Sequence, residues 1–157
     1  MTLLLADESA YRAHFSLNFC SRPIVFVTNV GPVPVYFAAR NFEHAFYEST
    51  YRDGVKDAFS PVRAERMDDI AAVLADPSAP RYIGWDKASR QHDATRCVCI
   101  ASGDFVVVIR LRVTSSGGLA ANFVTCYVAD NSIGKIRSAP AWNETACLAA
   151  LQARKGR

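Results

Sequence analysis

The sequence lacks most of the motifs by which an enzyme is recognised from its residues alone. It contains no HExxH, no CxxC and no cluster of carboxylates at metal-ligand spacing, so metal chemistry has little support. It has no GxGxxG or P-loop for a nucleotide cofactor, and no GxSxG elbow for a serine nucleophile. We therefore expect neither a metal nor a cofactor.

Long apolar runs are missing as well. No run approaches the ~20 residues that a membrane-spanning helix needs. The apolar run at 3–6 has no basic residue before it and is followed at once by Asp7 and Glu8, unlike a secretory signal. The five cysteines form an odd set, and Cys97 and Cys99 lie too close along one strand to bridge easily. These features predict a cytoplasmic protein in a reducing compartment, with no membrane partner.

The size and charge of the chain are ordinary for a globular protein. With 157 residues, half of them hydrophobic, it is expected to form a single domain over 1–157. The formal net charge of +3 permits binding to nucleic acid without demanding it. The placement of the basic residues therefore matters more than their sum.

The N-terminal half predicts a hairpin and a helix after a first segment of weak helical character. Residues 24–30 and 33–39 are β-branched or aromatic runs separated by Gly31-Pro32, which is a turn signal. Asn41 is a suitable N-cap for a helix that we expect to end at Gly54.

A second helix and a sheet are predicted to follow. Ser60 and Pro61 are typical of a helix start, and Asp76-Pro77 of its end. Three strand candidates come next, followed by a terminal amphipathic helix: residues 96–101, 104–113, 119–130 and 140–154. Short connections between sequential strands indicate an antiparallel meander, so the fold class is α+β.

Alternation along two of these strands predicts which residues share a face. On 104–113 one face carries Phe105, Val107, Ile109, Leu111 and Val113, and the other carries Val106, Val108, Arg110 and Arg112. On 121–127 one face carries Ala121, Phe123, Thr125 and Tyr127, and the other carries Asn122, Val124, Cys126 and Val128. Whether Arg110, Arg112, Thr125 and Tyr127 meet on an open face depends on the hairpin register, which the sequence does not determine.

The residues that remain available for chemistry are His, Arg, Lys, Thr and Tyr. Such an inventory suits RNA cleavage by attack of the ribose 2′-OH on the adjacent phosphate, which needs a base, an acid and fixed positive charge. Each candidate also has a plainer interpretation, since Thr and Tyr are good strand formers and a helix histidine is often simply exposed. Arg63, at the margin of a buried stripe, is expected to have a partner. Three structural partners for it remain open: Glu43, Glu48 and a backbone carbonyl.

Four segments resemble a known superfamily: FEHAFYES, FSPVRAERMDDIAAVLADP, FVVVIRL and NFVTCYVADNSIGKI. In them the chain is similar to the barnase–EndoU–colicin–RelE-like (BECR) nucleases, and the phage- and toxin-associated branches look closest. The resemblance covers residues 33–142, which it marks as a nuclease-like core. It implies one or two helices before a four-stranded antiparallel sheet, and a metal-independent endoribonuclease that acts on RNA.

The resemblance also implies roles for individual residues. His44 matches the helix histidine and would be the general base or acid, and Arg63 would clamp the scissile phosphate. Thr125 and Tyr127 match the strand pair that hydrogen-bonds the phosphate and orients the ribose. Four further basic residues are expected to bind substrate: Arg66, Lys87, Arg90 and Lys135.

Partners and alternatives follow from the same resemblance. Many members of the superfamily are toxins held by an inhibitor, so an antitoxin or immunity protein is an expected partner beside RNA. The absence of a second well-placed histidine leaves open a catalytically inactive RNA- or protein-binding domain of the same fold. A nucleotide-using ADP-ribosyl-transfer enzyme ranks last, because no catalytic Glu stands on a strand beside these residues.

Overall fold

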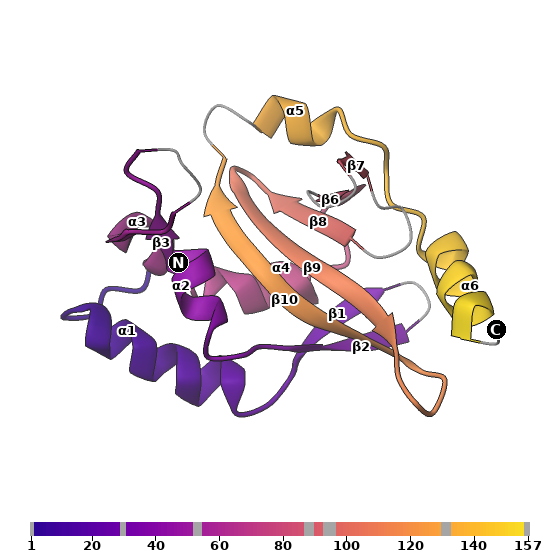
Figure 1. The fold of residues 1–157 in the computed structure, drawn as a ribbon, viewed down its shortest axis with the longest axis horizontal. Coiled ribbons are helices and arrows are strands. Elements are labelled where there is room, and N and C mark those ends of the chain that lie inside the picture. Colours follow the sequence, from indigo (N-terminus) through magenta and orange to yellow (C-terminus); the bar gives the residue numbers. More distant parts are fainter. Residues whose placement is uncertain are drawn as a thin grey trace.

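The computed structural model describes residues 2–28, 31–51, 55–86, 90–92, 97–129 and 133–155. It is an α+β fold around a six-stranded sheet whose strand order is β1-β2-β10-β9-β8-β5 (Figure 1). The sheet strands are β1 (Ile24–Thr28), β2 (Gly31–Tyr36), β5 (Arg81–Ile83), β8 (Cys97–Ser102), β9 (Phe105–Val113) and β10 (Leu119–Val128). Two-stranded pairs are formed by β3 (Tyr47–Glu48) with β4 (Ala58–Phe59) and by β6 (Trp85–Asp86) with β7 (Gln91–His92).

The helices are short. They are α1 (Glu8–Phe15), which continues into a π-helical turn at Ser16–Cys20, α2 (Asn41–Phe46), α3 (Pro61–Ala64), α4 (Asp69–Ala75), α5 (Ile133–Arg137) and α6 (Glu144–Lys155). In Figure 1, α4 lies behind the sheet, while β8, β9 and β10 face the viewer. Within the described ranges no helix combines the length and the apolar character needed to cross a bilayer.

The predicted meander is confirmed as β8, β9 and β10, which pair antiparallel in chain order. Its strands are rich in β-branched residues and its connections are short, so local pattern was sufficient to predict it. The predicted hairpin is also present as β1 and β2, but Gly31-Pro32 is not its turn. Both residues lie inside β2, where Gly31 pairs with Thr28 and Pro32 with Val27.

The hairpin is part of the main sheet, which the sequence did not indicate. β2 pairs in parallel with β10, with Val35 opposite Ala121 and Tyr36 opposite Asn122. Proline has no N–H to donate to a ladder, and this pairing begins only past Pro34. The sheet is therefore mixed rather than purely antiparallel.

The first predicted helix is much shorter than expected. It ends at Phe46 instead of Gly54, because Tyr47 adopts an extended backbone (φ −109°, ψ 154°) and pairs with Phe59. Asn41 is not the N-cap either. It is the first helical residue, and its side chain accepts a hydrogen bond from the Ala38 N–H at 2.7 Å.

The second predicted helix has the expected ends but is interrupted in the middle. The Ser60 side chain caps α3 by accepting the Arg63 N–H at 3.3 Å, and α4 ends at Ala75. Turns at 65–68 separate the two helices. The predicted apolar side of α4 is nevertheless buried, with Ile70 and Leu74 fully inside the core.

Several elements outside the meander were not predicted, among them β5, α5 and the short pairs β3–β4 and β6–β7. β5 lies within residues 80–94, which are mostly polar and aromatic, and α5 precedes the terminal helix. The terminal helix itself is present as α6. The Arg81 side chain on β5 forms a buried ion pair with Glu144 at 2.8 Å and covers the Phe26 ring, so it ties α6 to the sheet.

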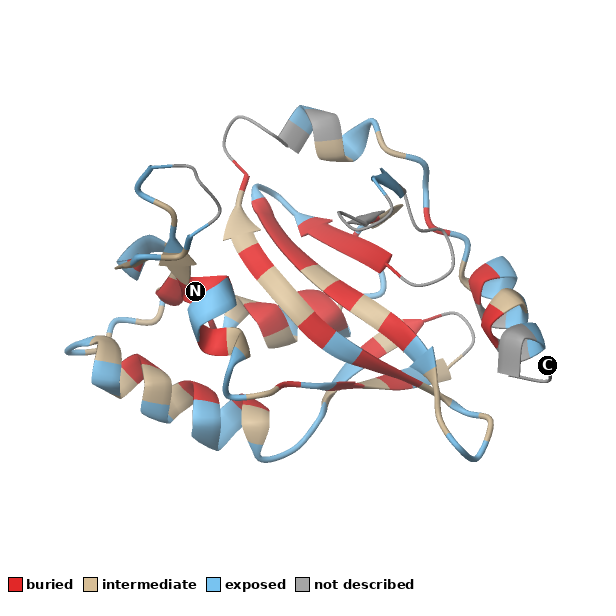
Figure 2. Cartoon of the chain, viewed as in Figure 1, coloured by how far each residue is buried: buried red, intermediate tan, exposed pale blue. Residues whose placement is uncertain are grey.

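The alternation predicted for β9 is confirmed, but that for β10 is wrong beyond Phe123. Phe105, Val107, Ile109 and Leu111 are buried in the main core. On β10 the pairing steps from Phe123–Ile109 to Thr125–Val108, so Val124 is an extra residue, a β-bulge. Cys126 therefore joins Ala121 and Phe123 in the core, while Thr125 and Tyr127 move to the opposite face. Figure 2 shows the alternating buried and less buried residues along both strands.

This bulge predicts opposite effects for two neighbouring substitutions. Cys126→Asn buries an amide in the core and should lower the free energy of unfolding by roughly 3 kcal/mol or more. Thr125→Asn places the same amide on the open face and should cost less than about 1 kcal/mol. Urea unfolding followed by circular dichroism measures both. A larger loss for Thr125→Asn than for Cys126→Asn would contradict the bulge.

Candidate active site on the open face of the sheet

A pocket of about 420 Å³ lies where α2, α3 and the preceding loop meet the open face of β8, β9 and β10; we call it the sheet pocket. All four residues predicted to be catalytic line it. The described residues that line it are His44, Lys56, Arg63, Cys97, Cys99, Val108, Arg110, Val124, Thr125 and Tyr127. Residues from two helices, a loop and three strands thus converge on one space.

The end of α2 positions both His44 and Arg63. The last carbonyls of a helix have no intrahelical partner, and here the Arg63 Nη1 donates to the carbonyls of Ala45 and Tyr47 at 3.4 Å each. The partner of Arg63 is therefore backbone carbonyl, rather than Glu43 or Glu48. His44 lies in the last turn of the same helix and is exposed. Arg63 thus holds its guanidinium beside the turn that carries the imidazole.

The bulge at Val124 brings the strand hydroxyls to this side. The Thr125 hydroxyl lies within 3.5 Å of the His44 carbonyl, to which it donates, so β10 and α2 meet here. Tyr127 is half-buried, and burial raises the pKa of its phenol to about 12, with the Cys99 thiol as the next cause. The nearby Arg63 cation opposes this rise without cancelling it. Tyr127 is therefore a hydrogen-bond donor at neutral pH.

The described residues that line the sheet pocket carry charge of one sign. Lys56, Arg63 and Arg110 line it together with His44, and no Asp or Glu is found among the lining residues that the structure describes. In a site of reduced solvent access, such an arrangement favours an anion. A phosphodiester is the anion for which planar guanidinium groups are well suited.

Two of these cationic residues were missed or left unassigned by sequence reasoning. Lys56 lies in the loop before β4, where no motif marked it. Arg110 was placed on the open face by strand alternation but given no role, because its meeting with α2 and α3 depends on long-range packing. Cys97 and Cys99, two residues apart on β8, both line the pocket, and burial raises the pKa of the Cys99 thiol to about 12.

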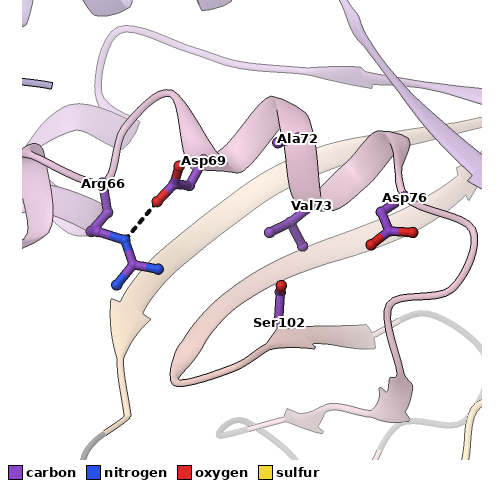
Figure 3. A pocket seen from close by; sticks show the side chains of 6 residues that line it. All are labelled: Arg66, Asp69, Ala72, Val73, Asp76 and Ser102. Carbon is purple, nitrogen blue, oxygen red and sulfur yellow. Dashed lines mark hydrogen bonds and ion pairs between the residues drawn. The ribbon is translucent and has the colours of Figure 1, made fainter. Parts of the chain in front are cut away.

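Arg66, predicted to bind substrate with Arg63, lies elsewhere. Its guanidinium pairs with Asp69 at 2.6 Å and with Asp104 at 3.4 Å, and it covers the ring of Phe105 on the core-facing side of the sheet. Figure 3 shows this side chain turned toward Asp69, at one end of a second pocket of about 280 Å³ that Val73 and Ser102 also line. Arg66 lies within the turns at 65–68, after the end of α3, and it does not line the sheet pocket.

Of the other three predicted substrate-binding residues, the structure describes the side chain of Arg90. Arg90 is exposed in a turn beside β7, with a positive φ of 54°, and does not line it. Lys87 and the side chain of Lys135 lie outside the described part of the chain. In the part that is described, no group of three or more His, Cys, Asp or Glu side chains could hold a metal ion.

Comparison with known proteins gives no relative from which a role can be transferred. No protein-family model, no curated protein and no solved structure matches the chain.

The raised pKa of Tyr127 predicts a loss of stability in alkali. Between pH 10 and 12 the unfolded phenol ionises while the folded phenol stays protonated, so the unfolded state binds fewer protons and stability falls as pH rises. The free energy of unfolding should decline less steeply over this range in Tyr127→Phe than in the wild type. Urea titrations at several pH values measure both slopes, and equal slopes would contradict the assignment.

Proposed function

We propose that the chain is a metal-independent endoribonuclease that cleaves RNA by attack of a ribose 2′-OH on the adjacent phosphate in the sheet pocket. The supporting observation is that His44, Arg63, Thr125 and Tyr127 line one cationic pocket although they come from three separate stretches of sequence, α2, α3 and β10. The same four residues carry the resemblance to the BECR nucleases.

The roles follow from the chemistry that each group can supply. The exposed imidazole of His44 is suited to take the proton of the 2′-OH. Arg63 places fixed positive charge where the phosphorane-like transition state gathers negative charge, and its Nη1 bonds to Ala45 and Tyr47 keep it in place. Thr125 and Tyr127 offer hydroxyls to the phosphate oxygens.

A second candidate, a catalytically inactive RNA-binding domain of the same fold, has one observation in its favour. Proton transfer is most efficient when a group's pKa lies near the working pH, and the pKa of Tyr127 is raised to about 12. Tyr127 is therefore poorly suited to protonate the leaving oxygen, and His44 is the only histidine among the lining residues that the structure describes. If the chain is catalytic, we propose that Lys56, which lines the same pocket, gives the leaving oxygen its proton.

The biological setting is proposed on the resemblance alone. A toxin or phage-associated effector of this type would act on cytoplasmic RNA and would be held by an antitoxin or immunity protein. The cationic sheet pocket is the natural place for such an inhibitor to present carboxylates.

The proposed reaction predicts RNA cleavage in the presence of EDTA. His44→Ala should lower the cleavage rate by roughly 10²- to 10⁴-fold, the usual contribution of general acid–base catalysis. Arg63→Ala should lower it by roughly 10²- to 10³-fold through lost transition-state stabilisation, with partial recovery in Arg63→Lys. The measurement is single-turnover cleavage of a labelled single-stranded RNA, with thermal unfolding of each variant to exclude a folding defect.

Two matched controls separate the pocket from the rest of the surface. Arg66→Ala removes an arginine three residues from Arg63 but on the core-facing side, and His14→Ala removes a histidine that instead contacts Asp68 at 2.6 Å. Both should cleave at close to the wild-type rate. Cleavage unchanged in His44→Ala and Arg63→Ala would reject the proposed roles, and RNA binding without cleavage would favour the inactive domain.

A further inference from the structure

A row of paired residues crosses the open face of the sheet and continues from the sheet pocket. Strand pairing places Cys97 of β8 opposite Arg110 of β9, Arg110 opposite Asn122 of β10, and Asn122 opposite Tyr36 of β2. Cys97 and Arg110 line the pocket. Because strands lie about 4.8 Å apart, Tyr36 is about 10 Å from Arg110 across the sheet, although it is remote in sequence. Figure 1 shows β2, β10, β9 and β8 as neighbours in this order.

The far end of this row has the features of a nucleotide-binding surface. Tyr36 is 45% exposed, a high value for a large aromatic side chain on a strand whose Val33 and Val35 are buried. The guanidinium of Arg112 lies 5.5 Å from the centre of the Tyr36 ring, and its Nε donates to the Asn122 side chain at 3.4 Å. An exposed ring, a cation and an amide therefore stand together.

The charge of this end favours an anionic occupant. Arg112 is exposed and forms no ion pair with any residue that the structure describes. Its contacts with Tyr36 and Asn122 hold the guanidinium in place without neutralising it. Proteins that bind single-stranded nucleic acid combine basic side chains with aromatic rings on which the bases stack.

We propose that Tyr36, Arg112 and Asn122 form a subsite for one nucleotide of a single-stranded RNA whose scissile phosphate lies in the sheet pocket. The base stacks on the exposed ring of Tyr36, Arg112 binds a phosphate, and the Asn122 amide is placed to hydrogen-bond a base edge. This inference rests on the proposed function for the identity of the polymer. The subsite requires a substrate that is single-stranded over at least one nucleotide beyond the cleaved bond, because a paired base cannot stack on the Tyr36 ring.

The subsite is tested with a short single-stranded RNA that carries 2′-O-methyl groups and therefore cannot be cleaved. Fluorescence anisotropy gives its Kd for the wild type and each variant. Base–aromatic stacking predicts a Kd that is roughly 5- to 150-fold weaker in Tyr36→Ala, and close to the wild type in Tyr36→Phe. Tyr36→Val, which keeps a strand-forming residue, should match Tyr36→Ala if the loss is stacking rather than unfolding.

Arg112 is tested by salt dependence against a charge-matched control. Arg112→Ala should lower the slope of log K against log salt by about one phosphate contact. Arg137→Ala removes the same charge from α5, where the guanidinium donates to the Gly103 carbonyl at 2.9 Å, and should leave the slope unchanged. Equal slopes for wild type and Arg112→Ala would overturn the phosphate role of Arg112.

The outcomes separate this inference from the proposed function. RNA binding and cleavage that persist in Tyr36→Ala and Tyr36→Val would overturn the subsite and leave the reaction standing. Binding that depends on Tyr36, from a protein that cleaves no RNA, would support the subsite and overturn the reaction. No binding of RNA by the wild type would overturn both, and would point to a protein ligand on this face.

Discussion

Val124 is an extra residue of β10 with no partner on β9, and this bulge determines which face of the sheet each later residue of β10 occupies. Before it, Phe123 points into the core; after it, Cys126 does. The two hydroxyl-bearing residues therefore leave the core side and line the sheet pocket. A strand of strict alternation would have buried Thr125 and Tyr127 beside Phe123, where their hydroxyls would lack water. The bulge reconciles a continuous core with a polar pocket on a single strand.

A second constraint joins the fold to the site at the end of α2. The helix stops after six residues, and the carbonyls that it leaves unpaired are bound by Arg63. The plain interpretation of this arginine, as a partner for backbone carbonyls, and the functional one are therefore compatible. Nη1 faces the helix end, and the guanidinium borders the pocket. Because these hydrogen bonds already hold the Arg63 guanidinium in place, it needs little reorganisation when an anion binds.

Several features that depend on neighbours in sequence were predictable, although the turn at Gly31-Pro32 and the N-cap at Asn41 were not found. Features that depend on distant pairing were not predictable. The meander and the cap at Ser60 follow from residue type over a few positions. The early end of α2 follows from the pairing of Tyr47 with Phe59, which propensity does not register. A spacing of three would place Arg63 and Arg66 on one face of an unbroken helix. The helix ends at Ala64, so Arg63 lines the sheet pocket while Arg66 pairs with Asp69 and covers Phe105. Side-chain faces can be inferred from periodicity only while the element is unbroken.

The parallel pairing of β2 with β10 determines when the sheet can be completed during folding. The parallel ladder between β2 and β10 cannot form until Ala121, which lies more than half the chain after Val35, has been synthesised. During synthesis the early hairpin thus emerges with an unsatisfied edge, and the strand that completes it also delivers Thr125 and Tyr127. Contacts so distant in sequence are formed slowly. The sheet pocket therefore cannot be complete until nearly the whole sheet has been synthesised.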